Sequence, residues 1–165
     1  MARNTIVRVT HRYNVPAERV FDAWITPAQA GRFLFVTRTG NIMQCDIEPH
    51  VGGSFSVTDR RPNADGDESF FDARHRGIYV EMNRPSRLAF DFAVGVSFDD
   101  ATRVVIDIAR NTGNSCELTL THDLGEGEEG QANAERTGQG WTRTLQMLDK
   151  VLNTRSWGFK FPGSA

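Results

Sequence analysis

The spacing of apolar residues changes once along this chain, and that change constrains its fold most. Apolar residues recur at roughly every second position through much of residues 40–123, and at helical spacing afterwards. Trp141, Leu145, Leu148 and Leu152 are four, three and four residues apart, which predicts one amphipathic helix over roughly 131–153. Because that helix has to bury its apolar stripe against the strands before it, the pattern indicates an α+β domain with an antiparallel sheet.

Turn-rich stretches such as NRPS and NTGNS divide the region of period two into about six strands. Four of these strands are expected near 69–82, 87–95, 102–110 and 115–123. The acidic, glycine-rich stretch LGEGEEGQ at 124–131 is expected to form a loop before the long helix.

A further strand and two short helices are expected before this region. Residues 5–15 alternate between apolar and polar side chains, as a half-buried strand does. The segment VPAERVFDAWI then changes to helical spacing, with Pro16 suited to a first helical position. Thr26 and Pro27 predict the start of a second short helix, which carries Phe33 and Phe35 near its end.

Size and charge exclude several classes of protein. At 165 residues the chain suits one domain, with a core over about 5–153 and a C-terminal tail at 154–165. A net charge of -2 gives no general attraction to nucleic acid or to an anionic membrane. No apolar run approaches the ~20 residues that a membrane-spanning helix needs, and the N-terminal stretch lacks the apolar segment of a secretory signal. We therefore expect a cytoplasmic protein.

Five blocks in order along the chain carry a resemblance to a known family. They are VPAERVFDAWITPAQAGRF, DIEPHVGGSFSV, GIYVEMNRPSRLAFDF, LTLTHDL and GQGWTRTLQMLDKVL. Together they resemble the SRPBCC superfamily, which includes the START and birch-pollen-allergen proteins. Within it they resemble the branch named for the C-terminal domain of the heat-shock-protein-90 ATPase activator. The resemblance implies a helix-grip fold, in which a curved sheet of about seven strands surrounds a long C-terminal helix, with a cavity between them that many relatives use for apolar small molecules.

Two departures from the branch argue against a chaperone partner. The branch often carries Arg-Pro before the paired glycines, where this chain reads Glu48-Pro49-His50-Val51. The N-terminal domain that accompanies the co-chaperone version is also not found in this sequence.

Aromatic side chains supply the candidate ligand-binding residues. Eleven Phe and three Trp stand against two Tyr, so many rings have to face apolar surroundings. Ligand pockets are mostly apolar and aromatic with a few polar groups, and rings from separate elements suit that description. The candidate ligand-binding residues are Phe33, Phe35, Phe55, Phe71, His75, Phe90, Phe92, His122, Trp141 and Leu145. The alternative is that several of these residues, Phe90, Phe92 and Leu145 among them, only fill the core.

His122 and His75 are the candidate catalytic residues, because an imidazole at the end of an apolar cavity can transfer protons near neutral pH. His122 shares a strand face with Leu118 and Leu120, and His75 shares one with Tyr79. The alternative for each is a hydrogen-bonded structural histidine. The four histidines show no metal-binding spacing, and the sequence has no nucleotide-binding motif, so neither a metal nor a cofactor is expected.

Gly138 and Gly140 open the apolar stripe of the long helix, which costs helix propensity of up to ~1 kcal/mol each. We expect them to remove side chains where the helix passes close to the sheet. Trp141 would then lie at the mouth of the cavity, the alternative being that its ring only anchors the core.

Three hypotheses for function follow. The first is binding of a hydrophobic or aromatic small molecule, lipid-like or polyketide-like, between sheet and helix. The second is an enzyme of polyketide-cyclase or hydrolase type that uses His122 or His75. The third and weakest is regulation of a chaperone ATPase or another protein interaction. Exposed edge strands and the aromatic tail make a homodimer a further hypothesis.

Overall fold

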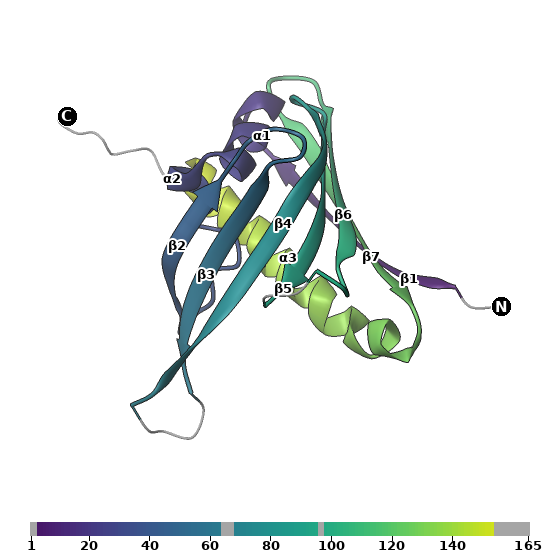
Figure 1. The fold of residues 1–165 in the computed structure, drawn as a ribbon. Helices are drawn as coiled ribbons and strands as arrows, with labels where there is room; N and C mark the ends of the chain where they lie inside the picture. The colour runs from purple at the N-terminus through teal and green to yellow at the C-terminus, as the bar shows by residue number, and fades with distance from the viewer. Residues whose placement is uncertain (1–2, 64–67, 96–97, 154–165) are drawn as a thin grey trace.

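The computed structural model describes residues 3–63, 68–95 and 98–153, and its centre is a curved antiparallel sheet in front of one long helix (Figure 1). The elements in chain order are β1 (Asn4–Tyr13), α1 (Ala17–Ile25), α2 (Pro27–Ala30), β2 (Asn41–Ile47), β3 (Ser54–Pro62), β4 (Phe70–Asn83), β5 (Arg87–Val94), β6 (Thr102–Arg110), β7 (Cys116–Glu126) and α3 (Glu128–Asn153). The predicted helix-grip arrangement of seven strands and a C-terminal helix is confirmed.

The seven strands lie in the order β1-β7-β6-β5-β4-β3-β2, so all pairs except one join neighbours in the sequence. The exception pairs the first strand with the last, with Val7 opposite His122. Every pair is antiparallel. Because side chains alternate across a strand, this register places Leu118, Leu120 and His122 on the same face of the sheet.

α3 runs diagonally across one face of the sheet, and its C-terminal end lies beside α1 and α2 (Figure 1). Leu145, Leu148 and Leu152 from this end are buried against the strands and α1. The Tyr13 hydroxyl on β1 donates a hydrogen bond to the carbonyl of Leu145 at 2.8 Å. The C-terminal half of the helix is therefore packed into a closed core.

α1 covers one end of this core. Its apolar spacing buries Val20, Phe21 and Trp24. Two ion pairs on its outer surface hold it to the sheet side of the molecule, one from Arg110 to Glu18 and one from Arg84 to Asp22 at 2.7 Å. Exposed ion pairs contribute little to stability because solvent screens them, so burial of the apolar face is what positions the helix.

Two of the sequence-based boundaries are wrong, and the first of them affects the site. α2 ends at Ala30, so Phe33 and Phe35 lie in the turn that follows it and not on the helix. The stretch 124–131 is not a loop, because β7 continues to Glu126 and α3 begins at Glu128. The tail at 154–165 lies outside the described residues.

Candidate functional site

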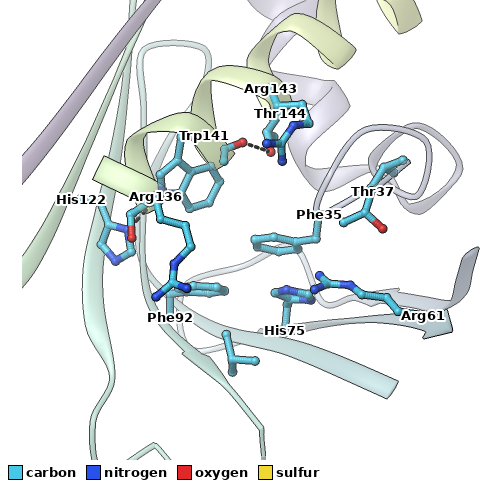
Figure 2. A pocket seen from close by; sticks show the side chains of 14 residues that line it. Phe35, Thr37, Arg61, His75, Phe92, His122, Arg136, Trp141, Arg143 and Thr144 are labelled. Carbon is cyan, nitrogen blue, oxygen red and sulfur yellow. Dashed lines mark hydrogen bonds between the residues drawn. The ribbon is translucent and has the colours of Figure 1, made fainter. Parts of the chain in front are cut away.

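A pocket of about 370 Å³ lies beside the N-terminal half of α3, between the helix, the turn after α2 and strands β3, β4, β5 and β7 (Figure 2). Its lining residues are Phe35, Val36, Thr37, Arg61, His75, Phe92, Val94, His122, Arg136, Thr137, Gly140, Trp141, Arg143 and Thr144. This volume falls within the ~300–1,000 Å³ typical of small-molecule sites. None of the lining residues is Asp or Glu.

Phe35 is the centre of the aromatic wall. Its ring stacks on His75 with centroids 4.1 Å apart and on Phe92 at 5.2 Å, and it lies 5.7 Å from the ring of Trp141. Its backbone is left-handed, with φ of 61°, a conformation that costs a bulky residue about 1–2 kcal/mol. The ring contacts offset this cost and fix the turn after α2 over the sheet.

Trp141 is held in place by His122. The indole Nε1 of Trp141 donates to Nδ1 of His122 at 3.0 Å, and Nε2 of His122 lies 2.7 Å from the Thr102 hydroxyl. Because an indole N–H can only donate, Nδ1 of His122 has to accept and the imidazole proton is assigned to Nε2. Burial lowers the pKa of His122 to about 4. Both of its nitrogens are therefore engaged in a neutral ring, and this contact orients the indole of Trp141.

His75 is the second histidine of the pocket, and its environment differs. Only 7% of the residue is exposed, and its Nδ1 has no hydrogen-bond partner in the described part of the chain. Burial lowers the pKa of His75 to about 4, so the ring is neutral at pH 7. A neutral imidazole stacked on Phe35 extends the aromatic wall and adds one polar nitrogen to it.

Two glycines create the space for this arrangement. A Cβ built on Gly77 would lie 2.0 Å from the ring of Phe55, so only glycine lets that ring cross β4. A Cβ on Gly140 would meet nothing within 4 Å, and Gly140 lines the pocket. The expected close approach of the helix is thus wrong for Gly140, whose missing side chain opens the pocket. Gly138 differs, because a Cβ there would make an ordinary contact of 3.5 Å with Val7.

The ten residues proposed from the sequence occupy three different places. Half of them line the pocket: Phe35, His75, Phe92, His122 and Trp141. Phe33, Phe55, Phe90 and Leu145 are buried in the adjoining core and are not among the lining residues. Phe71 is placed differently again, since it is 45% exposed on β4 and its ring lies under the guanidinium of Arg61, 5.9 Å from it.

Sequence reasoning missed the polar and charged part of the pocket, chiefly Arg61, Arg136 and Arg143. A signal was available for α3, because Arg136 and Arg143 lie four residues before and three residues after Gly140 and so share its helix face. No comparable signal existed for Arg61, because its approach to the pocket depends on the curvature of β3.

The described residues hold no group of three or more His, Cys, Asp or Glu side chains placed to bind a metal ion. Cys45 and Cys116 are both free thiols. Within the same residues, no helix is long and apolar enough to cross a membrane.

Fold and site together define an SRPBCC-type helix-grip protein with a pocket under the N-terminal half of its long helix. Residues 14–153 match the family described as Activator of Hsp90 ATPase homolog 1-like protein. The chain belongs to that family, which confirms the resemblance drawn from the five blocks. No curated protein matches it.

Solved structures show the same fold at low sequence identity. A protein from Rhodobacter sphaeroides is 22% identical with a TM-score of 0.72, over 90% of this chain and 94% of that one. An HSP90 activator from Plasmodium falciparum is 20% identical with a TM-score of 0.65, over 89% and 95%. DynU16, from the dynemicin biosynthetic locus, is 17% identical with a TM-score of 0.65, over 90% of this chain and 47% of that one.

Proposed function

We propose that this protein binds a hydrophobic or aromatic small molecule in the pocket beside the N-terminal half of α3. The observation that carries the proposal is the wall of rings, where Phe35 stacks on His75 and Phe92 and faces Trp141. A planar apolar guest would bury its faces against these rings, at about 25 cal/mol for each Å² of apolar surface removed from water.

The position of Gly140 supports this function over a purely structural one. A glycine inside an exposed helix costs about 1 kcal/mol relative to alanine, and here no close contact requires it. A larger side chain at 140 would project into the pocket. The sequence thus gives up helix stability at the one position where a side chain would fill the space.

Substitution at this position tests the proposal. We expect Gly140→Leu to abolish binding of a neutral aromatic probe, N-phenyl-1-naphthylamine, followed by its fluorescence. The same variant should unfold at a higher temperature, because leucine favours the helix by about 1 kcal/mol, which raises Tm by about 2–4 °C in a protein of this size. Gly138→Ala is the matched control, since position 138 lies on the same helix but outside the lining.

The two glycine variants should therefore separate the effect on probe binding from the effect on thermal stability. Gly138→Ala should raise Tm and leave the affinity for the probe unchanged. If Gly140→Leu folds and still binds the probe with wild-type affinity, the pocket is not the binding site and the proposal is wrong.

The second candidate function is an enzyme of polyketide-cyclase or hydrolase type, favoured by the unpartnered Nδ1 of His75 and by the likeness to DynU16. His75 is the acid or base in this alternative, because the nitrogens of His122 are already engaged. Turnover of a bound polyketide that is lost in His75→Phe, with binding retained, would favour the enzyme.

Regulation of heat-shock protein 90 is the remaining alternative, and it is suggested by the Plasmodium falciparum activator. A pull-down with heat-shock protein 90 and an assay of its ATPase test it directly. No association and no change in ATPase rate would exclude this alternative and leave ligand binding in place.

A further inference from the structure

Three arginines from two elements line the pocket (Figure 2). Arg61 extends from β3, while Arg136 and Arg143 extend from α3. The chain as a whole carries a net charge of -2, and the lining of the pocket holds no carboxylate. Positive charge is therefore concentrated around one pocket of a slightly acidic protein.

Arg61 is fixed by contacts on two sides. Its Nε donates to Oδ2 of Asp59 at 2.6 Å, and the Asp59 side chain is fully buried. The face of its guanidinium lies over the ring of Phe71. The charge of Arg61 is thus matched by Asp59, while its two terminal nitrogens make no hydrogen bond within the residues that the structure describes.

Arg136 and Arg143 lack an acidic partner in the described residues. Arg136 donates to the side-chain oxygen of Asn133, a neutral group. The side chain of Arg143 makes no hydrogen bond or ion pair in the same part of the chain. On a helix, a carboxylate three or four residues away can pair with an arginine, and no such position beside either arginine holds Asp or Glu.

From this arrangement we infer that the ligand is an amphiphilic anion, whose apolar body lies against the ring wall and whose acidic group binds Arg136 and Arg143. The inference rests on the function proposed above and names the class of ligand. A guanidinium presents its N–H groups as a fork that matches the two oxygens of a carboxylate or a sulfonate. The two arginines are 7 residues apart, so about two helical turns place both on the pocket side of α3.

Both pocket histidines are neutral at pH 7, so the positive charge of the lining comes from the arginines alone. With His75 and His122 uncharged, the ring wall is apolar and the positive charge lies only on the arginines. A molecule with one acidic end and a long or planar apolar remainder matches this division. A neutral molecule would use the wall alone.

Two naphthalene probes that differ by one sulfonate group test the inference. N-Phenyl-1-naphthylamine is neutral, and 8-anilinonaphthalene-1-sulfonate is its anionic counterpart. We expect the double variant Arg136→Gln/Arg143→Gln to weaken the sulfonate about tenfold or more and to change the neutral probe less than about twofold. Added salt should weaken only the sulfonate in the wild-type protein.

The double variant Arg12→Gln/Arg74→Gln is the matched control. It removes the same charge from two exposed arginines outside the lining. It should leave both affinities within about twofold of the wild type, because side chains alternate across a strand and these two lie on the face of the sheet opposite to that of Tyr13 and His75.

The outcomes separate the two proposals. If the neutral probe binds the pocket but the sulfonate binds the Arg136 and Arg143 variant as tightly as the wild type, the anion inference is wrong and ligand binding stands. If the Arg136 and Arg143 variant weakens the binding of both probes equally, the anion inference is again wrong and ligand binding stands. If neither probe binds the wild type, or if Gly140→Leu binds both as the wild type does, the proposed function fails and this inference fails with it.

Discussion

The two halves of α3 face the same sheet but meet it in different ways. In the C-terminal half, Leu145, Leu148 and Leu152 fill the space to the strands and α1. In the N-terminal half, the stripe carries Thr137 and Gly140, and a pocket remains. The comparison shows that side-chain volume along one helix decides where the protein is closed and where it is hollow.

Trp141 marks the boundary between the two halves. Its ring is almost fully buried, yet it lines the pocket and is oriented by a hydrogen bond to His122. A tryptophan held by a polar contact can close the core on one side and keep a flat face toward the pocket on the other. The predictions below test this division, from the largest expected effect to the smallest.

Leu148→Ala should produce the largest loss of stability, because Leu148 is fully buried in the closed half. A leucine-to-alanine change in a packed core costs about 2–5 kcal/mol, and urea denaturation measures it. Thr137→Ala in the pocket half should change the free energy of unfolding by less than about 1 kcal/mol. Equal losses in the two variants would contradict the distinction between the halves.

Acid should destabilise the pocket half through its histidines. The unfolded chain takes up protons below pH 6.5, whereas folded His75 and His122 remain neutral down to a pH of about 4. The unfolded state therefore binds more protons in this window, and the free energy of unfolding falls as the pH falls. Each histidine contributes up to about 3 kcal/mol of that loss.

His75→Phe keeps a ring on Phe35 but removes one of these two titrating groups. The decline in stability between pH 7 and pH 4.5, followed by urea denaturation, should be about 2–3 kcal/mol smaller in this variant than in the wild type. His50→Gln in an exposed turn is the control and should follow the wild type. An unchanged decline in His75→Phe would show that His75 is not buried and neutral in the folded protein.

Trp141→Phe should have a smaller effect, and it should lower both the stability of the protein and the affinity of the pocket for a ligand. It leaves Nδ1 of His122 buried without its donor, which costs about 1–3 kcal/mol. Affinity for a neutral aromatic probe should fall as well, because the ring wall loses area. If thermal denaturation shows that Trp141→Phe is as stable as the wild type, the role of His122 in positioning the indole is contradicted.

Much of the fold could be predicted from the sequence because its signals are local. Alternation over 102–110 predicted β6 with both bounds correct, and the leucine spacing predicted the C-terminal part of α3. The helix start was misplaced, because the glycines and glutamates of 124–131 resemble a loop while belonging to a strand end and a first helical turn.

The candidate site was predicted in its aromatic rings and its two histidines, but not in its arginines. Phe35, Phe92 and Trp141 are large apolar residues whose type already marks them for burial. Phe71 has the same type, but its position on β4 leaves it exposed beside Arg61. Residue type alone does not say which ring faces a cavity, because that depends on where the strand lies in the sheet.

The sequence by itself determined the order of the elements, the antiparallel sheet and the apolar stripe of the long helix, since periodicity and turn chemistry act over a few residues. Only the tertiary structure decided which half of that helix is closed, which nitrogen of His122 accepts the hydrogen bond from Trp141, and that Arg61 lines the same pocket as two arginines of α3. These features depend on contacts between residues far apart in the chain, and such contacts exist only once the sheet has curved around the helix.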